Sequence, residues 1–470
     1  MLLVVSSGVF LSSLDQFIVN IAFPAIGQDF APVSRASLSW VLTGYTIGFA
    51  ALLAPAGRLA DRFGRRRLFL SGMVVFTTAS AAAGASWNVA SLVSFRVVQS
   101  FGAAMVMSTS LALLLHTFPP ARRAFAISVW SAVGAVAATC GPTIGGLLVQ
   151  SSWRWIFLVN LPVGVAAMLV GRRVLTESRD AEETRWPDFL GTALIVTGIA
   201  AVTFGLVVGA DRGYRDTIVV AALAGGAVAL VATVLRAAWT PARLVPVLPL
   251  PLFRVRTFAT ANLAMTTFMI AFGALMLGNV LFFTEVWHLP SVRIGLYLLP
   301  APAIAALVAV PGGWLGNRLG HGPVAAFGVA LYGFACLWFA SVLGPAPEYV
   351  RDYLPGQVIA GIGVGLTFTN FASAVSSTLP PAWLASGSAT LSAARQIGTV
   401  LGVALLFAVM GTAVGGPLAP FRRAWLFMAT VAGVTSLTAA FIGRARSSTV
   451  EPGVEPGAER IAELVAEAPA

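Results

Sequence analysis

A single carboxylate, Asp15, lies deep in the long apolar stretch that opens the chain. An ionisable group in the hydrocarbon of a membrane is costly unless it is solvated, paired or neutralised, so such residues mark functional sites. Burial favours the neutral form of a carboxylate and a nearby arginine favours the charged form, so competition between the two lets the group load and release protons. We predict that Asp15 is a protonation site; the alternative is a carboxylate wetted at a helix end.

Two arginines also lie within apolar segments. Arg96 precedes Gln99 by three residues, so a cation and an amide share one face of a helix. The alternative for Arg96 is a long side chain that reaches the membrane surface. Arg395 lies in the middle of a late segment, where a buried arginine should face a cavity. Asn20 and Glu285 are further candidates for that cavity, and an interfacial charge is the alternative for Glu285.

Small residues form a stripe along one face of the segment at 124–149, spaced alternately three and four residues apart. Its members are Ser131, Gly134, Ala138, Gly141 and Gly145. Such a stripe lets a second helix pack very closely, and Pro142 predicts a bend inside it because proline removes a backbone donor. Simple helix packing is the alternative to a role in conformational change.

These candidates belong to a chain of 470 residues that is 58% hydrophobic and only 10% charged. A soluble domain carries about 25% charged residues, so a soluble fold is excluded. Apolar runs of about 20 residues can cross the ~30 Å hydrocarbon core as helices. We predict fourteen of them, near 2–23, 38–59, 68–86, 91–115, 124–149, 155–174, 189–209, 217–236, 258–284, 294–316, 322–343, 353–376, 383–410 and 422–443.

These segments predict an all-α membrane protein with two six-helix bundles and two extra central helices. The parts are an N-terminal bundle at 1–176, a linker with two extra transmembrane helices at 177–257, a C-terminal bundle at 258–443 and a disordered cytoplasmic tail at 444–470. The tail contains Pro-Gly pairs and several glutamates, a composition that buries too little apolar surface to fold alone.

The placement of the basic residues predicts the orientation. The net charge is +11 and every basic residue is an arginine. Most of them fall on one side of the alternating loops, which should be cytoplasmic, so we expect both termini in the cytoplasm and the chain in the inner membrane. The positive charge therefore reflects the orientation of the loops in the membrane and gives no support for nucleic-acid binding. The absence of lysine excludes a Walker A phosphate loop and a Schiff-base cofactor site.

An eight-residue pattern occurs twice. GRLADRFG at 57–64 and GWLGNRLG at 313–320 share the pattern G-x-L-x-x-R-x-G, and each follows the second helix of its six-helix set. Such duplication is typical of a transporter with two similar halves, a midplane site between them and alternating access.

The longer segment GRLADRFGRRR at 57–67 resembles, almost letter for letter, the cytoplasmic loop signature of the major facilitator superfamily. In that family the loop is a conformational latch. The resemblance implies that Asp61 contacts a neighbouring helix end, which suits a carboxylate, and that the arginines form charge contacts. The loop positions that match are Gly57, Asp61, Arg62, Gly64, Arg65 and Arg66.

Two further segments resemble motifs of the same superfamily. FRVVQSFGAA, with Arg96, Gln99 and Gly102, is similar to the fourth-helix motif linked in the family to proton transfer, although Ser100 replaces the usual glycine. The fifth helix resembles the antiporter motif that separates exporters from importers. Its residues are Gly134, Gly141, Pro142, Gly145 and Gly146.

Three segments are similar to signatures of the fourteen-helix drug:proton antiporter family of the EmrB/QacA type. They are LDQFIVNIAFP at 14–24, SWRWIFLVNLPVG at 152–164 and RQIGTVLG at 395–402. Phe17 replaces the usual threonine of the first, and Asn317 stands in the second-half loop where an acid is expected. Substrate detail therefore transfers less well than fold and coupling.

We therefore expect a proton-coupled antiporter that exports drugs, antibiotics or other small amphipathic compounds. The expected partners are a small-molecule substrate, protons and the lipid bilayer; the proton gradient is the energy source, and no metal or other cofactor is expected. A monomer is expected, and accessory export proteins are compatible with it. The alternatives are a dedicated exporter of one metabolite or siderophore and a non-transporting membrane sensor that depends on the acidic tail. No constellation of residues supports an intramembrane enzyme.

Overall fold

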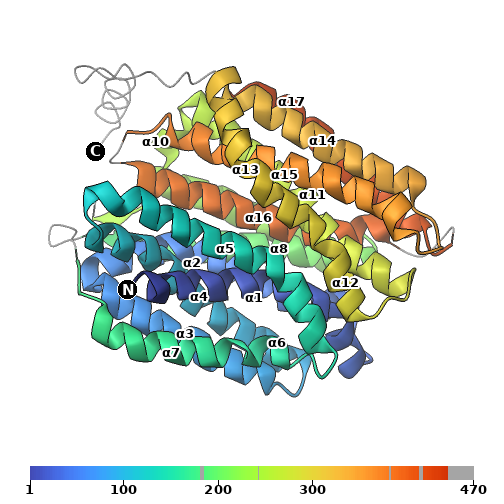
Figure 1. The fold of residues 1–470 in the computed structure, drawn as a ribbon, viewed down its shortest axis with the longest axis horizontal. Helices are drawn as coiled ribbons and strands as arrows, with labels where there is room; N and C mark the ends of the chain where they lie inside the picture. The colour runs from blue at the N-terminus through green and yellow to red at the C-terminus, as the bar shows by residue number, and fades with distance from the viewer. Residues whose placement is uncertain (180–184, 242, 381–382, 412–415, 443–470) are drawn as a thin grey trace. The chain divides into compact units, whose positions relative to one another are not determined.

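The structure is a computed structural model that describes residues 1–179, 185–241, 243–380, 383–411 and 416–442. Each of the fourteen predicted segments corresponds to a helix, or to a helix with one interruption, within these residues (Figure 1). The predicted tail at 444–470 lies outside them. The first set comprises α1 (Leu2–Asp29), α2 (Arg35–Phe63), α3 (Arg65–Gly84), α4 (Val89–Thr117), α5 (Pro120–Val149), α6 (Trp155–Leu158) and α7 (Asn160–Val174).

The remaining elements follow in the same order as the predictions. The two extra helices are α8 (Phe189–Arg212) and α9 (Thr217–Ala238), and a short helix α10 (Leu250–Phe253) precedes the second set. That set comprises α11 (Arg256–Glu285), α12 (Ser291–Leu298), α13 (Pro300–Leu319), α14 (His321–Val342), the π-helical turn η1 (Tyr349–Tyr353), α15 (Leu354–Ser376), α16 (Leu384–Met410) and α17 (Ala419–Ala440). Two short strands, β1 (Trp186–Pro187) and β2 (Leu244–Val245), pair in parallel.

Thirteen spans in the described residues are long and apolar enough to cross a membrane. The fourteenth predicted helix, α17, is 22 residues long and is not among them. Its N-terminal end carries Arg422 and Arg423, and several hydroxyl side chains interrupt its apolar face. The helix count is therefore close to the prediction, and the difference lies in the polarity of one helix.

The predicted boundaries differ from the structure mainly at prolines. The prediction ended the first helix before Pro24, but α1 continues to Asp29. Proline is tolerated inside transmembrane helices because neighbouring groups satisfy the backbone that it frees. By contrast, the predicted helix at 294–316 begins at Ser291 and is interrupted at Leu299, directly before Pro300, which lacks a backbone donor.

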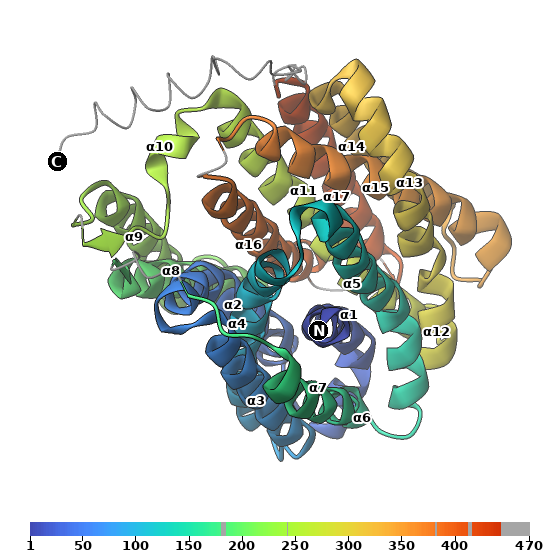
Figure 2. The same ribbon diagram turned by 60° about the vertical axis from the view of Figure 1, so that its left-hand side comes forward.

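The chain forms two compact units. The first comprises Met1–Thr233, Arg243–Val247 and Asn279–Leu299, and the second comprises Val234–Ala242, Leu248–Gly278 and the residues from Pro300 onward. In the first unit α1 packs along α5, and α4 packs against both α2 and α3 (Figure 2). In the second unit α14 packs against α15 and α17, and α13 against α15.

Glycines allow α3 and α4 to come almost into backbone contact. A methyl group at Gly102 would lie 2.7 Å from the carbonyl oxygen of Gly72, so no larger residue fits at this crossing. The contact places the later turns of α3 beside the first half of α4. Ser80 on α3 and Gln99 on α4 are thereby brought within hydrogen-bonding distance.

The duplicated loop pattern has the same backbone feature in both copies. Gly64 and Gly320, the last residues of the two patterns, have φ angles of 108° and 98°. Each is the N-terminal cap of the next helix, α3 and α14 respectively. Only glycine adopts such angles readily, which explains its presence at the end of both copies.

Candidate functional site

Asp15 lies at the middle of α1, with 0% of its surface exposed. Because α1 continues to Asp29, the carboxylate is fourteen positions before the last residue of the helix (29 − 15). The alternative of a carboxylate wetted at a helix end is therefore wrong.

Arg96 on α4 supplies the opposite charge. It is 1% exposed, and its Nη1 donates hydrogen bonds to Oδ2 of Asp15 and, at 2.8 Å, to Oε1 of Gln99. Its Nε donates to the carbonyl oxygen of Val41 on α2 at 3.2 Å. The guanidinium also lies over the ring of Tyr45, with 4.0 Å between its central carbon and the ring centroid. The alternative of an arginine that reaches the membrane surface is therefore wrong.

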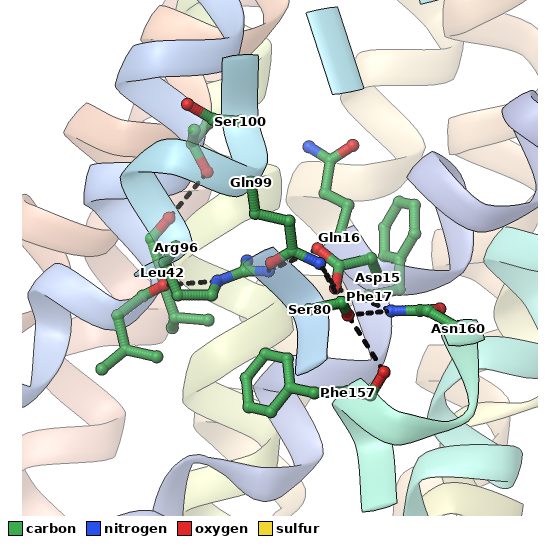
Figure 3. A network of polar contacts seen from close by, with 12 residues as sticks. Asp15, Gln16, Phe17, Leu42, Ser80, Arg96, Gln99, Ser100, Phe157 and Asn160 are labelled. Carbon is green, nitrogen blue, oxygen red and sulfur yellow. Dashed lines mark hydrogen bonds and ion pairs between the residues drawn. The ribbon is translucent and has the colours of Figure 1, made fainter. Parts of the chain in front are cut away.

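Amides and a hydroxyl complete the shell of the carboxylate (Figure 3). Gln99 Nε2 donates to Oδ1 of Asp15 at 2.9 Å and to Ser80 Oγ at 3.1 Å. Asn160, the first residue of α7, donates to the same Oδ1 at 3.4 Å and to Ser80 Oγ at 2.9 Å. Ser80 in turn donates to the carbonyl oxygen of Phe157 at 3.0 Å. We call Asp15, Ser80, Arg96, Gln99 and Asn160 the polar cluster.

The polar cluster links three helices. Each oxygen of the Asp15 carboxylate accepts from a cation or an amide, so its buried charge is compensated. Arg96 also has Gln99 and the Val41 carbonyl as acceptors. Because these groups come from α1, α2 and α4, the cluster holds the three helices together.

The small-residue stripe of α5 faces the helix that carries Asp15. A methyl group at Gly134 would lie 3.0 Å from Val9, one at Gly141 3.1 Å from Phe17, and one at Gly145 2.8 Å from Ile18. These partners all lie on α1, which shows close helix packing along this face of α5.

The other side of the same turn of α5 meets α12. The Gly146 position faces the backbone of Ser291, and a methyl group at Gly295 would lie 2.5 Å from the carbonyl oxygen of Pro142. Thr143 donates a hydrogen bond to the carbonyl oxygen of Gly295 at 3.2 Å. The motif residues of α5 therefore contact two helices at once.

The loop between α2 and α3 holds its charges in local contacts. Arg65, the first residue of α3, donates to Oδ1 of Asp61 near the end of α2 at 2.8 Å. Arg62 places its guanidinium 4.1 Å from the ring of Trp186. Gly57 faces Ser108 on α4, with 3.9 Å to an added methyl group. Arg65 thus pairs with a carboxylate, whereas Arg62 stacks on an aromatic ring.

Glu177 provides the carboxylate at the N-terminus of α3. Its two oxygens accept from the backbone N–H groups of Arg66 at 3.1 Å and Arg67 at 3.3 Å. These donors have no partner within the helix, so a carboxylate from the segment after α7 caps it. The Arg66 side chain donates to the carbonyl oxygen of Arg172 at 2.7 Å.

The three candidate cavity residues have different surroundings. Asn20 donates to the carbonyl oxygens of Gln16 and Phe17 on its own helix. Glu285 forms an ion pair with Arg35 at 2.9 Å, and both side chains are well exposed, as the interfacial alternative for Glu285 requires. Arg395 lies on α16 in the second unit, where its guanidinium is 6.0 Å from the ring centroid of Phe368. Of the three, none belongs to the polar cluster.

Sequence reasoning missed Ser80, Asn160 and Glu177. Asn160 falls inside the segment SWRWIFLVNLPVG, which resembles a family signature, but no contact or role of Asn160 was predicted from it. Ser80 lies among alanines and has no sequence signal. The segment SWRWIFLVNLPVG also contacts α1 at a second point, because Trp153 and Arg154 both donate to Asp29, at 2.8 and 2.9 Å.

The chain is similar to several known proteins. The tetracenomycin C resistance and export protein of Streptomyces glaucescens is 33% identical over 419 residues, which cover 88% of this chain and 76% of the relative. The multidrug export protein EmrB of Escherichia coli K12 is 30% identical over 407 residues, covering 86% and 78% respectively. A crystal structure of a D-xylose-proton symporter shares the fold, with a TM-score of 0.69 at 13% identity over 96% of this chain and 99% of that one.

The profile of the Major Facilitator Superfamily matches residues 5–403, which include the polar cluster, the loop at 57–67 and the stripe of α5. The chain is therefore a multi-pass membrane protein, and it belongs to the major facilitator superfamily.

Proposed function

We propose that this protein is a proton-coupled antiporter that exports drugs, antibiotics or other small amphipathic compounds across the cytoplasmic membrane. The observation that carries the proposal is the buried ion pair of Asp15 and Arg96 at the middle of α1, closed by Gln99 and Asn160. A carboxylate of this kind can alternate between a paired, charged form and a neutral one. The relatives named as resistance and export proteins support export as its direction.

In this proposal proton uptake and substrate release are linked through the packing of α1. A proton on Asp15 weakens the contact between α1 and α4, while the glycines of α5 let α1 shift along a surface without large side chains. The arginine-rich loops support a cytoplasmic location for both termini. Each proton that enters releases about 2.3 kcal/mol per 100 mV of membrane potential.

The experiment is proton release from everted vesicles with an acidic interior, followed with a pH-sensitive dye. A panel of lipophilic cations, neutral antibiotics and aromatic acids is added to vesicles that carry wild type, Asp15→Asn or Asp211→Asn. Asp211 lies exposed near the end of α8, so its variant controls for loss of one carboxylate. We expect release with wild type and the control, and none with Asp15→Asn.

The outcomes separate the proposals. Release that persists in Asp15→Asn would remove Asp15 from the coupling mechanism. No response of wild type to any compound would reject export of drugs by proton exchange. A response to one compound alone would favour a dedicated exporter. Deletion of residues 447–470 tests the sensor alternative, since transport should continue without them.

A further inference from the structure

Arg395 is a mid-membrane charge without a counter-charge among the described residues. It lies on α16, in the apolar span Ser386–Met410, and is partly buried. Within the described chain its guanidinium has no ion pair and no hydrogen-bond acceptor, and it lies 6.0 Å from the centroid of the Phe368 ring. Arg96, by contrast, has Asp15, Gln99 and the Val41 carbonyl as acceptors. An arginine stays charged in proteins, so Arg395 needs water or an anion.

The charge balance of the membrane segments leads to the same point. Among the described residues, the charged side chains well inside these segments are Asp15, Arg96 and Arg395, and the first two neutralise each other. The remaining charge is therefore one permanent cation. Such a charge repels a cationic ligand and attracts an anionic one, and the attraction is strong where water is scarce.

Aromatic rings lie next to this guanidinium. Phe368 is in contact with Phe272, with 5.8 Å between the ring centroids and 85° between the ring planes. Both rings are partly exposed. Phe268 and Tyr332 lie behind them and are buried, with centroid distances of 5.6 Å from Phe268 to Phe368 and 6.5 Å from Tyr332 to Phe272. The second unit thus presents two supported ring surfaces beside one unpaired cation.

Close packing of α16 on α11 fixes the position of the arginine. The Gly398 position, one turn after Arg395, faces the backbone of Thr266, and a methyl group there would lie 2.6 Å from Met269. A methyl group at Gly402 would lie 3.1 Å from the backbone nitrogen of Ala274. At both glycines α16 and α11 are in close contact, and a movement of one helix relative to the other would lose these contacts. The backbone that carries Arg395 is therefore held firmly.

We propose that Arg395, Phe272 and Phe368 bind the anionic group and the ring of an aromatic acid. The guanidinium donates two parallel hydrogen bonds to a carboxylate, or one to a phenolate, and the substrate ring packs against the two phenyl rings. The assignment deepens the proposed export function, on which it rests, by naming aromatic anions as the preferred substrates. The binding step takes no part in proton exchange, because Arg395 remains charged throughout.

The test uses three probes that share one ring system. 9-Anthracenecarboxylate is anionic, 9-anthracenemethanol is neutral and 9-(aminomethyl)anthracene is cationic. Each is titrated by fluorescence against the full chain in nanodiscs without a proton gradient, and empty nanodiscs correct for partition into lipid. The variants are Arg395→Gln, Arg395→Lys and Phe368→Ala, with Arg351→Gln as the control because its side chain is 85% exposed.

Wild type and the control should bind the anion most tightly and the cation least. Arg395→Gln should weaken the carboxylate about tenfold or more and change the alcohol less than twofold, since a hydrogen bond to a charged group is lost only for the former. Arg395→Lys should lie between, because an ammonium keeps the charge without the planar fork. Phe368→Ala should weaken all three probes.

Three results would overturn the assignment: no saturable binding of the carboxylate to wild type, an unchanged carboxylate affinity in Arg395→Gln, or tighter binding of the cation than of the anion. The second is the result expected if water alone solvates Arg395. Charge-selective binding without proton release from vesicles would reject antiport and leave the Arg395 site intact. Proton release driven by the cation but not by the carboxylate would reject the site and leave antiport intact.

Discussion

Asp15 and Arg96 form an ion pair in which neither side chain exposes more than 1% of its surface. Removal of one partner leaves a buried charge without compensation, which costs about 3–5 kcal/mol of stability. We predict this loss for both Asp15→Asn and Arg96→Gln, and a double variant that loses less than the sum of the two. The measurement is thermal unfolding in detergent, reported by a thiol-reactive dye on the fully buried Cys336 in a Cys140→Ser background, because Cys140 is only partly buried. Additive losses in the double variant would mean that Asp15 and Arg96 do not act as a unit.

Ser80 and Asn160 should be coupled in their contribution to stability. Ser80 Oγ accepts from both Gln99 and Asn160, so Ser80→Ala leaves two buried amides without that acceptor. We expect a loss of about 1–3 kcal/mol for Ser80→Ala, a similar loss for Asn160→Leu, and a smaller combined loss than the sum. The measurement is the double-mutant cycle in the same unfolding assay.

Thr203→Val supplies the control for this cycle. The hydroxyl of Thr203 on α8 is also buried, but it has no hydrogen-bond partner in the described chain. Its removal should be neutral or stabilising, because no bond is lost and an unsatisfied polar group disappears. A Ser80→Ala variant as stable as Thr203→Val would contradict the role of Ser80 in the polar cluster.

The polar cluster could be predicted only in part from the sequence. Asp15, Arg96 and Gln99 were predictable because charged and amide groups are rare in apolar segments and must find partners there. Their mutual contact was not, since it depends on how α1 and α4 pack. Ser80 could not be predicted at all: a serine in a membrane helix normally bonds to its own backbone, and only the Gly72 and Gly102 crossing brings it to Gln99.

The fold was more predictable than its interruptions. Hydrophobic length alone located the fourteen helices, because a helix that crosses the membrane must be long and apolar. The extension of α1 through Pro24 and the pairing of β1 with β2 depend on neighbouring segments that a local pattern does not contain. The cap from Glu177 is of the same kind, since 111 residues separate it from Arg66.

Gly145 and Gly225 form a matched pair of helical glycines. An added methyl group at Gly145 would lie 2.8 Å from the Ile18 side chain and 3.1 Å from its carbonyl oxygen on α1. One at Gly225 on α9 would meet nothing within 4 Å. We expect Gly145→Ala to lose about 1–3 kcal/mol through overpacking and Gly225→Ala to change stability little or to raise it by up to about 1 kcal/mol.

Transport should separate the same two variants. Because α1 carries Asp15, its displacement in Gly145→Ala should also reduce proton release in vesicles, whereas Gly225→Ala should release protons like wild type. Equal stability and equal release in the two variants would show that the close contact of α5 with α1 has no consequence for either property.

Gly64 should tolerate no side chain, for two separable reasons. Its φ angle of 108° strains any other residue, at a cost of about 1–3 kcal/mol. An added methyl group would also lie 2.6 Å from the carboxylate of Glu177, which caps α3. Gly213 has a φ angle of 90° with nothing within 4 Å of an added methyl, so Gly213→Ala measures strain of this kind without a clash. Gly64→Ala should therefore lose more stability than Gly213→Ala.

The excess should come from the displaced cap. Glu177→Ala alone should cost about 0.5–2 kcal/mol, since two backbone donors at the start of α3 lose their acceptor. In a Glu177→Ala background the clash and the cap are both absent, so Gly64→Ala should cost no more than Gly213→Ala does in wild type. If the two glycines instead give equal losses in wild type, the carboxylate moves aside freely and the cap contributes nothing to the loop between α2 and α3.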